Sequence, residues 1–154
     1  MENRFELFTT LIAKCSRSIK RIKNIEMKEF NLKSPHVSCL YYLYKSKGSL
    51  TATKLCEICD EDKAYISRSL DSLENSKYIY YEWQNTKRYN SSIFLTEKGN
   101  EVAQKIAEKI DNILENASIG LTEKDRQIFY DTLTLISNNL ENIIENKRKD
   151  RNEY

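Results

Sequence analysis

Apolar residues recur at three- and four-residue steps along most of this chain, and that spacing predicts amphipathic helices. The opening stripe is a long one, in which Phe8, Ile12, Cys15 and Ile19 share one face and lysines and arginines occupy the other. The pattern predicts six helices in all, at residues 4–28, 34–47, 52–58, 63–76, 97–117 and 123–145.

The helical spacing is interrupted once, between residues 78 and 95. Residues 78–83 are rich in aromatic and β-branched side chains and read as a strand, 84–90 are polar, and 91–95 read as a return strand. This combination predicts a mainly α-helical fold that contains one small β-hairpin.

Small polar residues stand where the helices are expected to begin. Such side chains accept hydrogen bonds from the free backbone N–H groups of a first turn. We expect Ser34 to cap the second helix, with Pro35 as its first residue, because proline suits that position. Thr51, Asp62 and Thr96 are the caps expected for the next three helices.

The order of these elements predicts a winged helix-turn-helix at residues 34–99, in which one helix enters the DNA major groove. Residues 97–117 would form a connecting helix, and the whole chain, 1–154, a single domain. The apolar stripes of the terminal segments, 1–30 and 118–154, need a partner surface, so we expect them to be dimerisation helices of a homodimer.

Charge supports nucleic-acid binding only weakly. The net charge is +2, but residues 1–48 carry +6, whereas residues 49–99 carry −1 and residues 100–154 carry −3. Any DNA contact must therefore depend on a few well-placed cations. No apolar run approaches the length of a membrane span and the N-terminus is not a secretory signal, so we expect a soluble cytoplasmic protein with no membrane partner.

Two motifs resemble those of the MarR family of bacterial transcription regulators. They are DKAYISRSLDSLENSKYI, beginning at Asp62, and FLTEKG, ending at Gly99, and the resemblance extends over nearly the whole chain. It implies a homodimer, most simply a repressor, on a pseudo-palindromic operator. The family's wing commonly carries an Asp–x–Arg set where this chain has Lys87 and Tyr89, with Arg88 between them.

The DNA-binding residues that we expect lie in three groups. Arginine can read a guanine edge, serine a base or phosphate, and alanine a thymine methyl, whereas a helix N-terminus and a wing suit phosphates. The groups are Thr51, Thr53 and Lys54 before or within the short helix, Lys63, Ala64, Tyr65, Ser67 and Arg68 on the recognition helix, and Asn85, Lys87 and Arg88 in the wing. The alternative is an ordinary amphipathic helix followed by a solvated turn.

Four cysteines are present, Cys15, Cys39, Cys56 and Cys59. The last two form a C-x-x-C pair, but a structural zinc site needs four ligands, so we expect no metal. Cys15 lies between Lys14 and Arg17, which would favour its thiolate and a redox role if it were exposed. Burial as small apolar residues is the interpretation that we favour for all four.

Regulators similar to this one often bind a small aromatic effector between the dimer helices and the DNA-binding lobe. Residues that could line such a pocket are Phe8, Ile12, His36, Cys39 and Tyr42. An aromatic-rich core explains each of them equally well. His36 has no nucleophile or acid at catalytic spacing.

We therefore predict a DNA-binding transcriptional regulator that is released from its operator by a small ligand or an oxidant. The alternative is a winged-helix module that docks another regulator instead of DNA, which the −1 charge of residues 49–99 favours. We predict neither an enzyme nor a bound cofactor, because no phosphate loop, metal cluster or nucleophile–base spacing is present in the sequence.

Overall fold

A computed structural model describes residues 4–82 and 91–152, and these form two compact units, residues 1–111 and 112–154. The fold is mainly α-helical with a two-stranded antiparallel hairpin, as predicted. In chain order the elements are α1 (Arg4–Glu26), the 3-10 helix η1 (Lys28–Phe30), α2 (Ser34–Lys45), α3 (Ala52–Cys59), α4 (Lys63–Asn75), β1 (Ile79–Glu82), β2 (Ser92–Leu95), α5 (Glu97–Ala117) and α6 (Glu123–Asn152).

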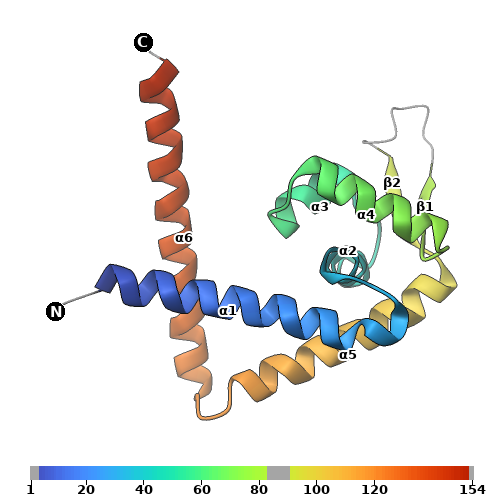
Figure 1. Ribbon diagram of the computed structural model, residues 1–154, viewed down its shortest axis with the longest axis horizontal. Coiled ribbons are helices and arrows are strands. Elements are labelled where there is room, and N and C mark those ends of the chain that lie inside the picture. Colours follow the sequence, from blue (N-terminus) through green and yellow to red (C-terminus); the bar gives the residue numbers. More distant parts are fainter. Residues whose placement is uncertain (1–3, 83–90, 153–154) are drawn as a thin grey trace. The chain divides into compact units, whose positions relative to one another are not determined.

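Helix α2 is the centre of the first unit. Figure 1 shows it with α3 and α4 on one side and α1 and α5 on the other. Its Val37, Leu40 and Leu43 are fully buried, as are Leu55 of α3 and Ile106 of α5. Because α2 contacts α1, α3, α4 and β2, it fixes the positions of the elements that form the winged helix.

The hairpin pairs Ile79 with Leu95 and Glu82 with Ser92. Leu50, just before α3, forms an antiparallel β-bridge with Ile93 of β2. Each residue's N–H donates to the other's carbonyl, with N···O distances of 2.9 and 3.4 Å. This bridge ties the start of the helix-turn-helix to the hairpin.

The segment from Thr96 to Gly99 joins the hairpin to the end of α4 through hydrogen bonds and close packing. The Thr96 hydroxyl donates to the carbonyl of Lys77 at 2.7 Å and accepts from the Gly99 N–H at 3.0 Å, so it caps α5 as predicted. A Cβ at Gly99 would lie 1.8 Å from the Tyr78 carbonyl oxygen, so only glycine permits this close approach. Lys98 adds a contact over the Tyr78 ring, 4.3 Å from its centroid.

The second unit consists of the end of α5, a turn and α6. Gly120 in the turn has a φ of +90°, which favours glycine. Thr122 caps α6, because its hydroxyl accepts from the Asp125 N–H and the Asp125 carboxylate accepts from the Thr122 N–H. Over the described residues, the model contains no helix with the length and apolarity needed to cross a membrane.

Several element ends differ from the sequence predictions. The cap of α2 is Lys33 and not Ser34, because Ser34 is already the first residue of the helix; its N–H donates to the Asn24 side chain of α1 at 3.0 Å. The first helix ends at Glu26 and a 3-10 turn follows it. Helix α6 continues to Asn152, beyond the end that the apolar stripe predicted.

Candidate nucleic-acid interface

Two side-chain caps set the helix-turn-helix. Thr51 accepts a hydrogen bond from the Lys54 N–H at 3.2 Å, and Asp62 accepts one from the Tyr65 N–H at 2.8 Å. Between the two helices, Asp60 has a left-handed φ of 50°, which ends α3 and reverses the chain. Both caps were predicted from the sequence, since the signal for a cap is local.

Helix α4 has two distinct faces. Ile66, Leu70 and Leu73 are at most 1% exposed and pack into the core, as predicted. Four of the five residues expected to face DNA lie on the open side, and all four are exposed: Lys63, Ala64, Ser67 and Arg68. Within the described part of the chain Arg68 has no ion pair, so its guanidinium can meet an acceptor outside the protein.

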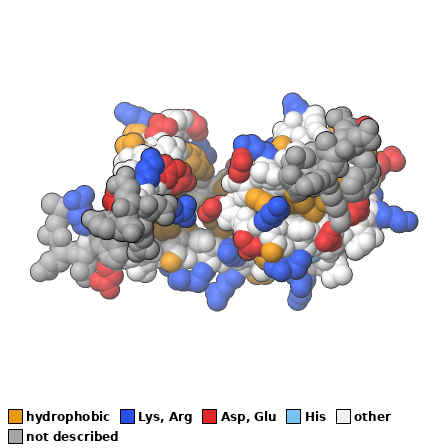
Figure 2. Space-filling model, turned by 90° about the horizontal axis from the view of Figure 1, so that it is seen from above, with side chains coloured by type: hydrophobic (Ala, Val, Ile, Leu, Met, Phe, Trp, Pro, Cys, Tyr) orange, Lys and Arg blue, Asp and Glu red, His pale blue; other side chains and the backbone are white. Residues whose placement is uncertain are grey.

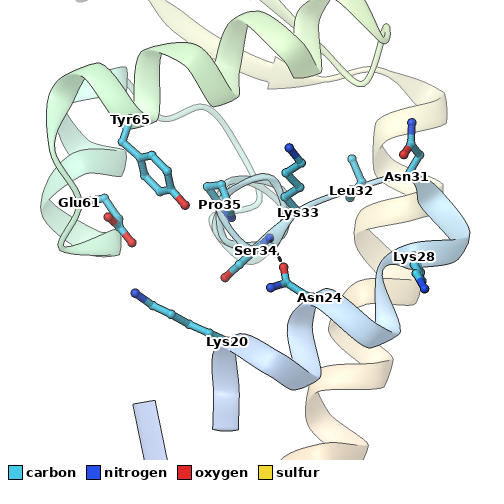
Figure 3. Close-up of a pocket in the computed structure, with 10 residues that line it drawn as sticks. All are labelled: Lys20, Asn24, Lys28, Asn31, Leu32, Lys33, Ser34, Pro35, Glu61 and Tyr65. Carbon is cyan, nitrogen blue, oxygen red and sulfur yellow. Dashed lines mark hydrogen bonds between the residues drawn. The ribbon is translucent and has the colours of Figure 1, made fainter. Parts of the chain in front are cut away.

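Tyr65, the fifth residue, is placed differently. It is half-buried, and Figure 3 shows its ring directed from α4 toward Pro35 at the start of α2. Position 65 comes four residues before the buried Ser69, so the two lie on one face of the helix and Tyr65 borders the core instead of the centre of the open face.

The residues expected to bind phosphate around α3 are only partly available. The Thr51 hydroxyl is used as the helix cap, and the Lys54 ammonium lies 2.8 Å from the Glu57 carboxylate. The Thr53 side chain is exposed. The wing residues Asn85, Lys87 and Arg88 lie outside the described residues.

Charge on the molecular surface is mixed. On the face shown in Figure 2, lysines and arginines are interspersed with aspartates and glutamates. A DNA contact would therefore depend on individual side chains such as Arg68, as the charge distribution of the sequence indicated.

The structure has a hollow that the sequence did not predict. A hollow of about 540 Å³ opens between the end of α1, the start of α2 and the turn into α4 (Figure 3). Its lining contains none of the five predicted residues, and consists of Lys20, Asn24, Lys28, Asn31, Leu32, Lys33, Ser34, Pro35, Glu61 and Tyr65.

The five residues of the predicted pocket have other positions. Cys39 is fully buried in the core, Tyr42 packs against that core, Ile12 is exposed on α1 and Phe8 is partly exposed there. The Nδ1 atom of His36 accepts a hydrogen bond from the Lys33 N–H at 3.2 Å, which helps to cap α2. Burial and the nearby Lys33 charge hold the pKa of His36 below its usual value.

Three lysines around this hollow were missed by the sequence reasoning. Lys20, Lys28 and Lys33 come from α1, η1 and the cap of α2. The +6 charge of residues 1–48 was the available signal, but only the fold shows that these three lysines meet around one hollow.

Of the four cysteines expected to be buried, Cys39 is buried, Cys56 and Cys59 are partly exposed, and Cys15 is exposed on α1, so the expectation is wrong for Cys15. A redox role for Cys15 stays a prediction. The nearby Cys59 thiol and burial raise the pKa of Cys39, a proximity that the sequence did not predict. Over the described residues, no group of three or more Cys, His, Asp or Glu side chains is placed to hold a metal ion.

Neither the models of known protein families nor the curated protein sequences match this chain. Solved structures do. A MarR family transcriptional regulator from Listeria monocytogenes, complexed with a 26mer DNA, is 26% identical, with a TM-score of 0.78 over 86% of this chain and 87% of that one. The transcriptional regulator SlyA is 25% identical, with a TM-score of 0.75 over 86% of this chain and 93% of that one.

A third structure supports the fold alone. NMB1585, a MarR family regulator from Neisseria meningitidis, is 18% identical, with a TM-score of 0.81 over 94% of this chain and 99% of that one. The similarity therefore includes both terminal helices as well as the winged helix.

Proposed function

Because this chain belongs to the MarR family of transcriptional regulators, we propose that it binds double-stranded DNA as a homodimer and represses transcription. The observation that carries the proposal is the open face of α4, where Lys63, Ala64, Ser67 and Arg68 are exposed within a winged helix. The similar Listeria regulator has been solved with DNA, which supports the same kind of ligand here.

Arg68 is the residue that we assign to base recognition. Its planar guanidinium can donate two parallel hydrogen bonds to a guanine edge, a contact worth about 1–3 kcal/mol of discrimination. Ser67 and Ala64 lie beside it and would add a polar and an apolar contact. Lys63, at the start of α4, and the wing residues Lys87 and Arg88 would bind phosphates.

A second copy of the chain would cover the apolar faces of the terminal helices. Leu7, Leu11 and Ile19 of α1 are each at least 50% exposed. Helix α6 exposes a longer set to a similar degree, namely Ile128, Phe129, Tyr130, Leu135, Leu140, Ile143 and Ile144. Large exposed apolar faces on a monomer are typical of interaction surfaces. A two-fold dimer would then present two recognition helices to a pseudo-palindromic operator.

The test is a DNA-binding titration with the intergenic DNA upstream of the protein's own gene. Arg68→Ala should weaken binding on the order of 5- to 150-fold, the equivalent of about 1–3 kcal/mol, and should relax base preference at one position per half-site. Arg21→Ala, which removes the same charge from an exposed site on α1, is the matched control and should change affinity much less. If Arg68→Ala alters neither affinity nor preference, the assignment of α4 is wrong.

The hollow beside α4 is the site that we propose for a small aromatic effector. Lys20, Lys28 and Lys33 outnumber Glu61, the one carboxylate of the lining, while Pro35 and the Tyr65 ring supply apolar surface, so an aromatic carboxylate fits its chemistry. Because Tyr65 belongs to α4, an occupant would displace the recognition helix and could favour release. Benzoate should raise the melting temperature of the protein, and Lys20→Ala should reduce that shift.

The alternative function, docking of another regulator, can be distinguished from DNA binding by experiment. The −1 charge of residues 49–99 and the missing Asp–Arg pair of the wing favour it. DNA binding through phosphates must weaken steeply as salt rises. Specific binding of a partner protein, without measurable DNA affinity at low salt, would support docking and exclude DNA recognition.

A further inference from the structure

Helix α1 is attached to other elements of the first unit at its C-terminal end. None of the α1 side chains that the structure describes is buried, whereas Met27, directly after the helix, is 1% exposed. In the last turn, the Lys23 ammonium donates to the Ser38 hydroxyl of α2 at 3.1 Å. One residue further on, the Asn24 side chain accepts from the Ser34 N–H at 3.0 Å (Figure 3). A long exposed helix is thus connected to α2 through its last turn.

Lys109 of α5 contacts the same end of α1. Its ammonium lies 3.0 Å from the carboxylate of Glu26, the last residue of α1, and 2.7 Å from the carboxylate of Glu29 in η1. In the chain, these two carboxylates lie on either side of the buried Met27. We call residues 23–30 the α1 joint, because α2 and α5 both contact this end of α1.

The order of charges along α5 suits the observed placement of that helix. Asp111, two residues after Lys109, pairs with Lys45 of α2 at 3.6 Å. A shift of α5 that moved Asp111 into the place of Lys109 would set it against two carboxylates, which is repulsive. The side chains of these pairs are 35% to 56% exposed, so each pair adds little stability. Their effect is to define the position of α5 against α1 and α2.

A small rotation at the α1 joint becomes a large displacement at the other end of α1. The helix has 23 residues and is about 35 Å long, because an α-helix rises 1.5 Å per residue. A tilt of about 6° at one end moves the other end by roughly 3.5 Å, similar to the ~3.4 Å between successive bases of one DNA strand. Since the proposed dimer interface lies along α1, the angle at the α1 joint sets the distance between the two winged helices.

We propose that Lys109 is a positioning residue for DNA recognition. By bridging Glu26 and Glu29 it fixes the angle at which α1 leaves the winged helix, and so the spacing of half-sites that the dimer accepts. This role rests on the proposed function, because half-site spacing matters only for a dimer on DNA. Lys109 is given no contact with DNA, so its loss should change the spacing preference and not the phosphate contacts.

The contact itself can be tested without DNA, by amide hydrogen exchange of the full-length protein. Lys109→Met removes the charge and keeps the length, Lys109→Arg keeps the charge, and Lys105→Met removes a charge from an exposed site one turn earlier on α5. Exchange in the α1 joint should be roughly threefold faster in Lys109→Met and unchanged in the other two variants. Glu29→Gln should also accelerate exchange, but should add nothing to Lys109→Met. Unaltered exchange in Lys109→Met would show that Lys109 does not hold α1.

The second measurement is affinity for the upstream DNA fragment that the protein protects, and for versions with one base pair inserted or removed between the half-sites. The wild type should favour the native spacing, Lys109→Met should reduce that preference roughly threefold, and Lys109→Arg should restore it.

Two results would overturn the positioning role. One is an unchanged spacing preference in Lys109→Met. The other is an equal loss of affinity at all three spacings with a weaker salt dependence, which would mean that Lys109 binds a phosphate. If the wild type binds none of the fragments, the proposed function fails instead, and the exchange measurement still decides whether Lys109 holds α1.

Discussion

At the scale of single residues, Gly99 is the glycine that cannot accommodate a side chain. The backbone of α5 passes so close to Tyr78 that a Cβ at Gly99 would lie 1.8 Å from a carbonyl oxygen and 2.8 Å from the carbonyl carbon. Both are backbone atoms, which cannot rotate away as a flexible side chain could. The glycine of the FLTEKG motif therefore has a structural reason that is independent of DNA.

Gly99→Ala should consequently lower the free energy of unfolding by about 3 kcal/mol, the upper end of the usual range for overpacking. Gly48→Ala is the matched control, since its Cβ would meet only the Ser46 carbonyl oxygen at 3.8 Å, and should change stability by less than about 0.5 kcal/mol. Urea denaturation of both variants measures the difference, and equal stabilities would show that α5 can shift to make room.

His36 is the second informative residue, because its Nδ1 atom must be unprotonated to accept the Lys33 N–H. Its pKa is lower in the folded protein than in the unfolded chain, so the unfolded chain binds more protons between the two values. The contribution of His36 to stability is complete above about pH 6.5 and is lost as the pH falls toward the folded pKa.

The stability of the wild type should therefore fall more steeply than that of His36→Gln between pH 7 and pH 5, because glutamine can accept the same hydrogen bond and does not titrate. Thermal melts across this range give the comparison, with the carboxylates common to both proteins cancelling in the difference. Parallel curves would contradict the capping role of Nδ1.

At the scale of elements, much could be predicted because the signals for helix starts are local. Thr51, Asp62 and Thr96 cap the helices that the sequence assigned to them, and Ile66, Leu70 and Leu73 are buried as their spacing required. The prediction of Ser34 as a cap was wrong by one residue, because α2 begins at Ser34 itself, where the Ser34 N–H finds an acceptor on Asn24 of another helix. The hollow beside α4 could not be predicted for the same kind of reason, since its lining comes from segments up to 45 positions apart, from Lys20 to Tyr65.

The cap of α4 offers a test at this scale. Asp62→Ala leaves the Tyr65 N–H without its side-chain acceptor and should cost about 1 kcal/mol of stability. Asp62→Asn keeps an equivalent acceptor and should cost much less, which separates the hydrogen bond from the negative charge. Equal losses in the two variants, measured by chemical denaturation, would mean that the charge alone matters.

At the scale of the whole molecule, the apolar stripes of α1 and α6 could be read from the sequence, but their partner could not. An apolar stripe indicates that one face of a helix is buried in the assembled protein, but it does not identify the surface that buries it. Cys15 illustrates the problem, because it follows the apolar spacing of α1 and is nevertheless exposed in the single chain. Whether such residues are buried depends on assembly and not on the fold of one copy.

We expect Leu11→Glu to shift the protein toward monomers, raising the dimer dissociation constant at least tenfold, since a buried unpaired carboxylate is costly at an interface. Leu11 is 50% exposed in one copy. Thr10→Glu adds the same charge at the adjacent exposed position and should have a smaller effect. Sedimentation velocity over a concentration series distinguishes them, and an unchanged dimer in Leu11→Glu would place the interface elsewhere.

The hydrogen bonds that join Thr96 and Lys98 to the end of α4 have a consequence for which sequence changes the protein can tolerate. Thr96 donates a hydrogen bond to the Lys77 carbonyl, and Lys98 donates one to the Ser76 carbonyl. The two ends of the hairpin segment, 78–95, are therefore held together by residues outside the hairpin. The entropy of closing a loop rises only slowly with its length, by about 0.6 kcal/mol for each doubling. Insertions between Glu82 and Ser91 should therefore cost little stability, which leaves the wing free to diversify in length and charge while the remainder of the winged helix stays constant.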